Sequence, residues 1–459
     1  MTVLLAPRAS LRSPDTGSEQ LMTRRAWWLV AVGFLLPGSA QVLAGNRRLG
    51  RVGIVATLVL LGLLVLGGIL WLVSRSFVLT IVGNAVGLLV LEVLAFAYAV
   101  LWLVLGFDTL RITRVARAAP RLRAAIAAVA IVATVVPAGA AAYGGTLLDA
   151  GRGLVSSVFA FGGPSVDPID GQYTFMLLGG DAGADRVGLR PDSITVVSVN
   201  AETGAATMIG VPRNMERVPF PEGSVMATQY PNGFDCGDGD PADCYINAAY
   251  TYGQNNPDLF PDAESDGSSP GIEATREAVE GATGIPIQFF VIVDMQGFDD
   301  LVDALGGITI DIPYDVPIAI EGGPVEEWIY AGDDVVLDGY HALWYARSRA
   351  GANDYQRMER QRVVQEAVIA QFTPQTLLTQ YAALSSAGQD LVQTDIPQSM
   401  IGTLTDLAER TRALPITNVE LVPPAVQTYD PDFPAVHAMV AEGIAAADAV
   451  DDPSPSPTP

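Results

Sequence analysis

Two groups of carboxylate and guanidinium side chains could carry chemistry in the C-terminal two thirds of this 459-residue chain. The first group lies in the segment GGDAGADRVGLRPDS, residues 179–193. Asp181 follows an apolar run that is typical of a buried strand, and Asp192 comes directly before the next strand. Because sites in α/β proteins form at the carboxyl ends of strands, we expect Asp181 to lie at such an edge.

The expected strand pairing brings a guanidinium to these carboxylates. If AETG at 201–204 is the turn of a hairpin, paired residues have numbers that sum to about 405. Asp192 then faces Arg213, with Arg190 close by in the sequence, although one slip in register would separate them. The alternative interpretation is ordinary turn chemistry of Asp and Asn together with a surface ion pair.

The second group is a run of arginines in YARSRAGANDYQRMERQR, residues 345–362, which holds five of the 13 arginines that follow residue 123. We place Arg347 and Arg349 on a strand, where residues two apart share one face. A solvated basic helix face is the alternative for this group. That alternative suits Arg360 and Arg362 better than the strand pair.

A helix over about 354–371 would add to the second group. Asp354 is a candidate N-cap, so Arg357 and Gln361 become neighbours one turn apart near the start of the helix. Guanidiniums that converge beside free amide N–H groups favour a polyanion, above all a phosphate or pyrophosphate.

Together the two groups predict phosphate chemistry assisted by a metal ion. Asp181 and Asp192 could hold Mg²⁺ or Mn²⁺, because such hard ions prefer oxygen ligands and retain water and phosphate oxygens. The arginines would neutralise the rest of a pyrophosphate and the charge of its leaving group. The chain has no lysine, which excludes Schiff-base and P-loop chemistry, and its only histidines are His341 and His437.

A sheet covered by helices is needed to position these side chains. Apolar runs predict strands at 174–180, 193–200, 205–212, 287–293, 308–313 and 417–423. Helical periodicity predicts helices at 297–305, about 354–371 and about 433–447. The mixture indicates an α/β fold with a mixed central sheet rather than an all-β sandwich. Residues 254–271 are typical of an acidic loop, and residues 450–459 of a disordered tail.

The N-terminal portion predicts an α-helical membrane module at 26–148, after a cytoplasmic leader at 1–25. Three apolar runs are each long enough to span a bilayer, at about 52–73, 77–106 and 124–148. Arginines flank the shorter run 26–44 on both sides, which predicts a re-entrant or interfacial segment. Four full spans with the N-terminus outside are the alternative.

This topology predicts a multi-pass protein of the cell membrane with a cytoplasmic N-terminus. A linker at 149–170 would lead to an extracytoplasmic domain at 171–449. Residues 1–123 carry a formal charge of +9 and the remainder −33, which together give −24. The acidic part offers no broad cationic surface, so nucleic-acid binding is excluded there, while the basic flanks suit membrane lipid.

Cys236 and Cys244 are the only cysteines, eight positions apart in a loop rich in Gly, Asp and Pro. Outside the membrane a disulfide is favoured over a metal site, because no matching Cys or His ligands are present. Free thiols are the alternative.

Over roughly 172–372, and more weakly to about 425, the sequence resembles the LytR-CpsA-Psr (LCP) family of cell-envelope glycopolymer transferases. The segments that carry the resemblance are LLGGDAG…LRPDSITVVSVN, MIGVPRN, INAAYTYG, VDMQGF…LVDALGGI and LDGYHALWYARSR…DYQRMERQR. The resemblance implies an α/β/α sandwich with an apolar cleft for a polyprenyl chain. It also implies transfer of a glycan from polyprenyl pyrophosphate to a muramic-acid hydroxyl of peptidoglycan.

By position, the resemblance makes Asp181 and Asp192 the metal-associated catalytic aspartates. It makes Arg213 both a catalytic residue and a member of a pyrophosphate clamp, which has Gln361 beside it. The clamp arginines are Arg190, Arg213, Arg347, Arg349 and Arg357. This sequence departs from the family pattern at two places. Asn214 stands where the family motif commonly has Asp, and the N-terminus has several predicted spans. A composition without lysine and rich in Ala, Val and Gly is typical of a high-GC actinobacterium, for which teichoic-acid-like or arabinogalactan-like polymers are candidate donors.

The sequence therefore predicts a Mg²⁺-dependent, membrane-anchored phosphotransferase of cell-wall biogenesis. It would move a glycan-phosphate from a polyprenyl-pyrophosphate donor to a peptidoglycan acceptor. Two alternatives stay open: hydrolysis of the same donor with water as acceptor, and a non-enzymatic envelope sensor or scaffold.

Overall fold

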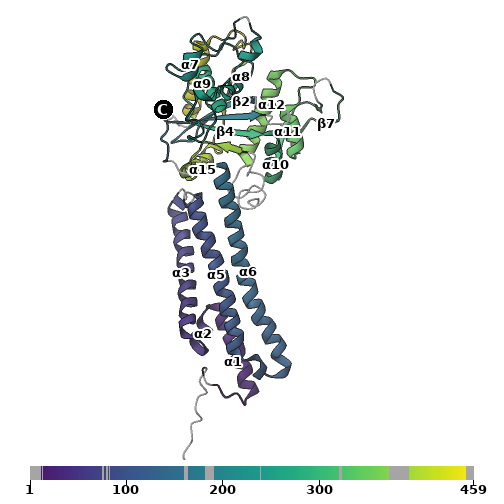
Figure 1. The fold of residues 1–459 in the computed structure, drawn as a ribbon. Helices are drawn as coiled ribbons and strands as arrows, with labels where there is room; N and C mark the ends of the chain where they lie inside the picture. Colours follow the sequence, from purple (N-terminus) through teal and green to yellow (C-terminus); the bar gives the residue numbers. More distant parts are fainter. Residues whose placement is uncertain are drawn as a thin grey trace, which may run out of the picture. The chain divides into compact units, whose positions relative to one another are not determined.

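The computed structural model describes residues 12, 14–74, 77–78, 81, 83–159, 164–180, 191–237, 239–319, 323–371 and 392–450. The chain divides into two compact units, Met1–Arg152 and Gly153–Pro459. The described part of the first unit is helical, and all the described strands belong to the second (Figure 1).

Long apolar helices build the N-terminal unit. Within the described residues, three helical segments are long and apolar enough to cross a membrane: Arg47–Val73, Ala85–Arg117 and Pro120–Ser156. They correspond to α3 (Arg47–Val73), α5 (Ala85–Thr113) and α6 (Pro120–Val158). The helix α5 begins later than the apolar run does, because the Asn84 side chain accepts hydrogen bonds from two backbone N–H groups and caps it there.

The shorter apolar run is broken into two helices, α1 (Glu19–Leu35) and α2 (Ser39–Ala44). The break falls at Gly38, whose φ of 95° is in the left-handed region that favours glycine. Gln41 of α2 is fully buried and donates hydrogen bonds to the Leu105 carbonyl at 2.8 Å and to Thr109 Oγ1 at 3.0 Å. The run therefore packs against α5, and its re-entrant or interfacial position in a bilayer stays a prediction.

A six-stranded mixed sheet, in the order β10-β3-β2-β1-β4-β9, organises the second unit. The central strand β1 is antiparallel to β2 and parallel to β4, while β10 is parallel to β3. The strand bounds are β1 Gln172–Gly180, β2 Pro191–Asn200, β3 Ala206–Val211, β4 Phe289–Asp294, β9 Val392–Thr394 and β10 Thr417–Glu420.

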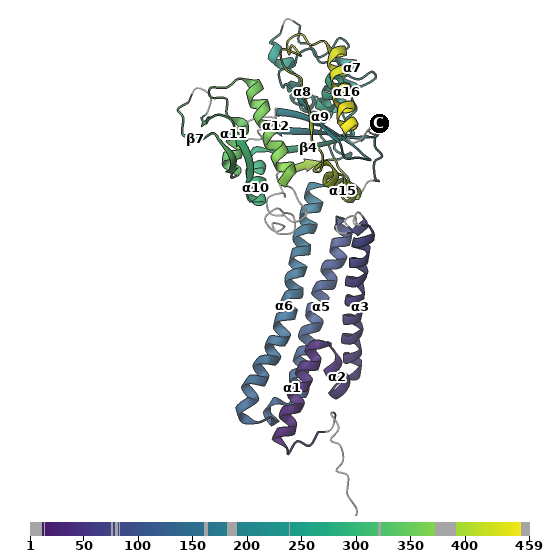
Figure 2. The ribbon, with the colours of Figure 1, turned by 180° about the vertical axis from the view of Figure 1, so that it is seen from behind.

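Helices cover both faces of this sheet (Figures 1 and 2). Alternate residues of β2 point to opposite sides, so Val196 joins a core with α9 (Pro270–Thr283) and α16 (Phe433–Val450). Val197 joins a separate core that includes Leu407 of α15 (Ile401–Thr411). The helix α12 (Asp354–Gln371) contacts the second face, where Thr195 donates to Gln365 at 3.2 Å. The predicted α/β fold, with helices on both sides of a mixed sheet, is confirmed.

Two small two-stranded sheets and two helices form a second core beside the main sheet. Buried Val302, Ile310, Leu337 and Tyr345 fill this core together with Val364 of α12. The elements are α10 Met295–Leu305, β5 Ile308–Ile312, β6 Val316–Ile318, β7 Glu327–Ile329, β8 Gly332–Leu337 and α11 Gly339–Arg347. This core anchors α11 and α12, which carry the arginine-rich segment.

Three smaller predictions concern the acidic loop, the cysteine pair and the C-terminal tail. The helices α8 (Ala248–Asn255) and α9 take up both ends of the predicted acidic loop, because apolar residues there pack into the first core. Cys236 and Cys244 form a disulfide, the pairing that the sequence favours. The predicted C-terminal tail lies outside the described residues except for Val450, where α16 ends.

Candidate active site

Asp192 lies at the start of β2, beside the end of β1, and its carboxylate is the centre of the site. The hairpin register pairs Ile194 with Val211 and Thr195 with Gly210, which is the predicted sum of 405. Arg213 follows β3 and donates to Asp192 Oδ1 at 2.5 Å. The predicted pairing of Asp192 with Arg213 is therefore confirmed, because the turn and the apolar alternation fix the register.

Arg349 reaches the same carboxylate, with its Nη2 atom 3.4 Å from Asp192 Oδ1. The strand expected for Arg347 and Arg349 is wrong: Arg347 is the last residue of the helix α11, and Arg349 follows its C-cap, Ser348. Burial of Tyr345 in the second core keeps this segment helical. Arg347 lies over the Trp344 ring, 5.5 Å from its centre, so the two arginines do not share a strand face.

Arg357 of α12 adds a third guanidinium from a buried position. Its Nη2 atom donates to the Asp192 carbonyl at 3.2 Å and lies 2.9 Å from Asp354 Oδ1. The expected N-cap is wrong by one residue, since the Asn353 side chain accepts from the Gln356 N–H and the Asn353 N–H donates to Gln356 Oε1. Asp354 is thereby free to pair with Arg357 and to lie 3.7 Å from Arg213 Nε.

The alternative of a solvated basic helix face is wrong for Arg360 and Arg362. Arg360 is 2% exposed and donates to the Ser348 carbonyl, so it anchors the segment that carries Arg349. Arg362 donates to Glu420 Oε1 of β10 at 3.1 Å. Arg360 lies over the Tyr345 ring of the second core, whereas Arg362 faces the sheet because α12 lies over it, and a local pattern reveals neither arrangement.

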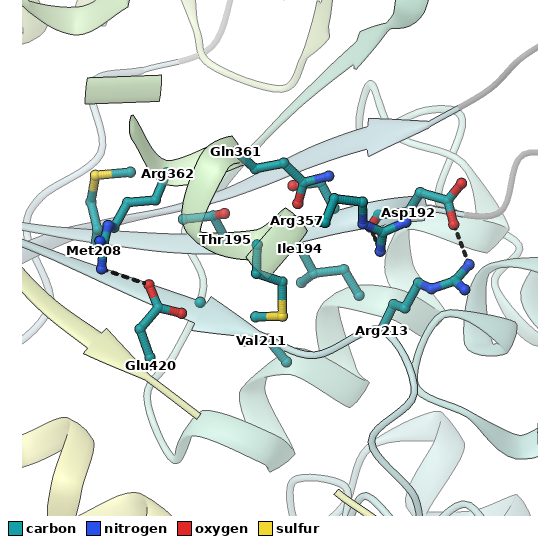
Figure 3. A pocket seen from close by; sticks show the side chains of 13 residues that line it. Asp192, Ile194, Thr195, Met208, Val211, Arg213, Arg357, Gln361, Arg362 and Glu420 are labelled. Carbon is teal, nitrogen blue, oxygen red and sulfur yellow. Dashed lines mark hydrogen bonds and ion pairs between the residues drawn. The ribbon is translucent and has the colours of Figure 1, made fainter. Parts of the chain in front are cut away.

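A pocket lies between α12 and the strands β2, β3 and β10 (Figure 3). Arg213, Arg357 and Asp192 lie at one end of it, and Gln361 lies above its middle. The lining between the two ends mixes polar side chains, such as Thr195 and Gln361, with apolar ones. Its apolar members are Ile194, Met208, Val211 and Met358.

The charged end of the pocket is suited to an anion. Of the described residues, three arginines meet two carboxylates there: Arg213, Arg349 and Arg357 against Asp192 and Asp354. The Nε atoms of Arg213 and Arg357 are buried and make no hydrogen bond to any described residue. Burial, together with repulsion from Arg349 and Arg213, lowers the pKa of Arg357 to about 10 despite its attraction to Asp354. An oxyanion would satisfy these donors and offset that repulsion.

The predicted residues Asp181 and Arg190 lie outside the described residues. The described residues contain no group of three or more acidic, His or Cys side chains placed to hold a metal. One Asp192 oxygen points away from Arg213 (Figure 3), and the side chain is 36% exposed. Its oxygen chemistry fits a hard divalent ion that takes its remaining ligands from another carboxylate, water and phosphate.

Three features of the site are not predicted by the sequence. Asp354 acts as an ion-pair partner of the arginines, and the Arg362–Glu420 pair joins residues 58 positions apart. The spacing of local motifs contains no signal for such a distant pair. Asn214, at the position noted for its missing carboxylate, has a buried Oδ1 that accepts no hydrogen bond from the described residues.

Fold and site together define an α/β domain that presents converging guanidiniums to an anion, in a chain that also has long apolar helices. The LytR_cpsA_psr family model matches residues 161–430, which is more than half of the chain. The chain therefore belongs to the LytR_cpsA_psr family.

Curated relatives carry the name polyisoprenyl-teichoic acid–peptidoglycan teichoic acid transferase. TagU of Halalkalibacterium halodurans is 28% identical over 226 residues, which cover 49% of this chain and 61% of TagU. TagV of Bacillus subtilis is 26% identical over 209 residues, 45% of each chain. The chain thus spans less than two thirds of these relatives. The crystal structure of B. subtilis TagV matches with 23% identity and a TM-score of 0.43, over 60% of this chain and 97% of that one.

Proposed function

We propose that this protein is a membrane-anchored phosphotransferase that attaches a glycopolymer to peptidoglycan. Its donor would be a glycan linked to a polyprenyl pyrophosphate, and its acceptor a muramic-acid hydroxyl. The observation that carries the proposal is the convergence of Arg213, Arg349 and Arg357 on Asp192 at one end of a pocket that is partly lined by apolar side chains. Family membership and the names of TagU and TagV support the same reaction.

The geometry suggests how the donor binds. Buried N–H groups of Arg213 and Arg357 lack hydrogen-bond acceptors among the described residues, and a pyrophosphate supplies such acceptors. Exclusion of water at Arg357, which is 2% exposed, strengthens each charge interaction there. The apolar side chains of the lining suit the first part of a prenyl chain.

The reaction would form one phosphorus–oxygen bond and break another. The acceptor hydroxyl oxygen bonds to the phosphorus on the glycan side, and the bond from that phosphorus to the bridging oxygen breaks. Polyprenyl phosphate leaves, and Arg213 and Arg357 stabilise the charge that develops on it. The hydroxyl proton passes to one of the carboxylates Asp181 and Asp192.

We include a divalent cation in the proposal. Mg²⁺ or Mn²⁺ held by Asp181 and Asp192 would supply charge neutralisation on the pyrophosphate oxygens. We also propose that the three apolar helices anchor the chain in the cell membrane, with the second unit on its outer side. The arginine-rich flanks of these helices support that orientation.

A transfer assay with the full-length protein tests this function. The protein in detergent receives a radiolabelled lipid-linked glycan, peptidoglycan and Mg²⁺, and label on the peptidoglycan is counted. Arg213→Gln should reduce transfer by about 100-fold or more, because it removes a charge that stabilises the leaving group. Arg217→Gln is the matched control, since Arg217 is 58% exposed and pairs with Asp430 outside the pocket.

Product analysis separates the alternatives. Free glycan-phosphate without label on peptidoglycan would favour hydrolysis. Equal transfer by wild type and Arg213→Gln, or normal wall attachment in cells that carry Arg213→Gln, would favour a sensor or scaffold and would overturn the proposal.

A further inference from the structure

The residue that follows the helix α11 is held by two contacts. Ser348 is 1% exposed, and its hydroxyl donates to the Pro317 carbonyl of β6 at 2.6 Å. Arg360 of α12 donates to the Ser348 carbonyl. The next residue in the chain is Arg349, whose guanidinium reaches the Asp192 carboxylate. The backbone is therefore fixed directly before the residue that reaches the site.

The other contacts of Arg360 lie in the same region. Its guanidinium is 5.8 Å from the centre of the Tyr345 ring, and its Nε atom donates to the Gln356 carbonyl of α12 at 3.4 Å. Tyr345 is 1% exposed and belongs to the second core. Arg360 thus connects α12 with the end of α11, and the two helices are neighbours in Figures 1 and 2.

Burial by itself does not explain an arginine at position 360. The side chain is 2% exposed, and burial lowers the pKa of Arg360 despite the opposing influence of Tyr314 and Tyr345. None of the carboxylates that the structure describes attracts this guanidinium strongly enough to offset its burial. A buried cation without such a partner is unfavourable for folding, so an apolar side chain would pack there at lower cost. The hydrogen bond to the carbonyl before Arg349 gives the arginine a role that an apolar side chain lacks.

The short connection between α11 and α12 turns immediately after Arg349. Gly351 has a φ of 73°, in the left-handed region, and the Ala352 N–H donates to the Arg349 carbonyl at 3.2 Å. These contacts shape the turn, whereas the Ser348 contacts attach it to the rest of the domain. A backbone that is fixed before binding leaves Arg349 with less conformational freedom to lose when it binds an anion.

We propose that Arg360 is a positioning residue for Arg349: by holding the Ser348 carbonyl, it keeps the Arg349 guanidinium at Asp192, where a phosphate oxygen of the substrate would bind. The inference rests on the proposed function for its ligand class, a pyrophosphate. Arg360 acts through Arg349 and takes no part in the bond changes.

A double-mutant cycle tests this role with inorganic pyrophosphate as the probe. Isothermal titration calorimetry measures its affinity for the full-length protein in detergent. Arg349→Gln should weaken binding about tenfold, because it removes a charge-assisted hydrogen bond. Arg360→Met should also weaken binding about tenfold. The double variant should lose about tenfold in total rather than about 100-fold, because a misplaced Arg349 contributes little that its replacement can remove.

Two further variants make the result specific. Ser348→Ala removes the hydrogen bond to Pro317 and keeps a small buried side chain. It should weaken binding in the same direction without adding to Arg349→Gln, and it tests the same contact region if Arg360→Met does not fold. Arg410→Met is the matched control, because Arg410 donates to the Glu202 carbonyl at 2.6 Å, at the opposite end of the β2–β3 hairpin from Asp192. Its loss should leave the affinity unchanged with either residue at position 349.

Wild-type affinity in a folded Arg360→Met variant would overturn the positioning role, as would a loss of about 100-fold in the double variant, since independent effects multiply. A wild-type protein that does not bind pyrophosphate would overturn it as well. The transfer assay reports separately on the proposed function. Losses that do not multiply, without label transfer by the wild type, support the positioning role alone. Transfer with multiplied losses supports the proposed function alone.

Discussion

Replacement of Arg357 by methionine should separate the stability of the domain from its affinity for pyrophosphate. The guanidinium is 2% exposed, and burial lowers its pKa from the ordinary value of an arginine to about 10. One pKa unit corresponds to about 1.4 kcal/mol, so the charged form costs the folded state about 3 kcal/mol. Methionine removes that cost but also the hydrogen bond to the Asp192 carbonyl, which is worth about 1–2 kcal/mol. We therefore expect the free energy of unfolding to stay level or rise by up to about 2 kcal/mol.

The pH dependence of this effect follows from the direction of the shift. Arg357 is a base whose pKa is lower in the folded protein, so the destabilisation by its charged form is complete below about pH 10 and is relieved only as the pH rises above that value. The stability difference between Arg357→Met and wild type should therefore be constant between roughly pH 6 and pH 9.

Affinity should change in the opposite direction. Loss of a charge-assisted hydrogen bond to a phosphate oxygen costs roughly 2–3 kcal/mol, so pyrophosphate should bind about 30- to 100-fold more weakly. Isothermal titration calorimetry of the full-length protein measures this affinity, and urea unfolding followed by circular dichroism measures stability.

Arg276→Met is the matched control, a buried helical arginine with the opposite pKa shift. Burial acts to lower the pKa of Arg276, but attraction to Asp395 and Glu273 outweighs it and raises the pKa. Its removal leaves Asp395, which is 13% exposed, without this partner and should cost about 3–5 kcal/mol. The reasoning is refuted if Arg357→Met loses more than about 2 kcal/mol of stability, or binds pyrophosphate as tightly as wild type.

Three other substitutions test separate parts of the structure. Asp192→Asn removes a carboxylate that repels phosphate, so metal-free pyrophosphate binding by calorimetry should not weaken, while label transfer should fall about 100-fold or more; weaker binding would contradict this role. The Cys236→Ser/Cys244→Ser variant should lose about 2–3 kcal/mol, because the short loop is no longer closed in the unfolded chain, and thermal unfolding with and without reductant measures it. Burial raises the pKa of Glu280, an acid that accepts from the Ile287 N–H at 2.8 Å. The wild-type fold therefore loses stability as the pH rises above 4.5, which is the pKa of this side chain in the unfolded protein. Glu280→Gln should therefore melt higher than wild type at neutral pH and lose this advantage as the pH falls below about 4.5, and equal melting temperatures at neutral pH would be evidence against it.

The sequence by itself determined the hairpin and the ion pair at its open end. The apolar alternation on both sides of residues 201–204 fixes a register with period two, and this register places Asp192 opposite Arg213. It also determined the long helix Asp354–Gln371, because its periodicity is local. Strand and helix patterns of this kind are set by neighbours in the chain, so a window of sequence contains them.

Only the tertiary structure decided what each arginine of the second group does. Arg347 ends a helix because Tyr345 is buried in a core built from distant segments, whereas a short sequence window is equally compatible with a strand. Arg360 is buried because it packs against Tyr345 and the Ser348 carbonyl, and Arg362 pairs with Glu420 because α12 lies over the sheet next to β10. The charge, length and hydrogen-bonding capacity of an arginine follow from its residue type, but its burial and its partner depend on which elements pack over it.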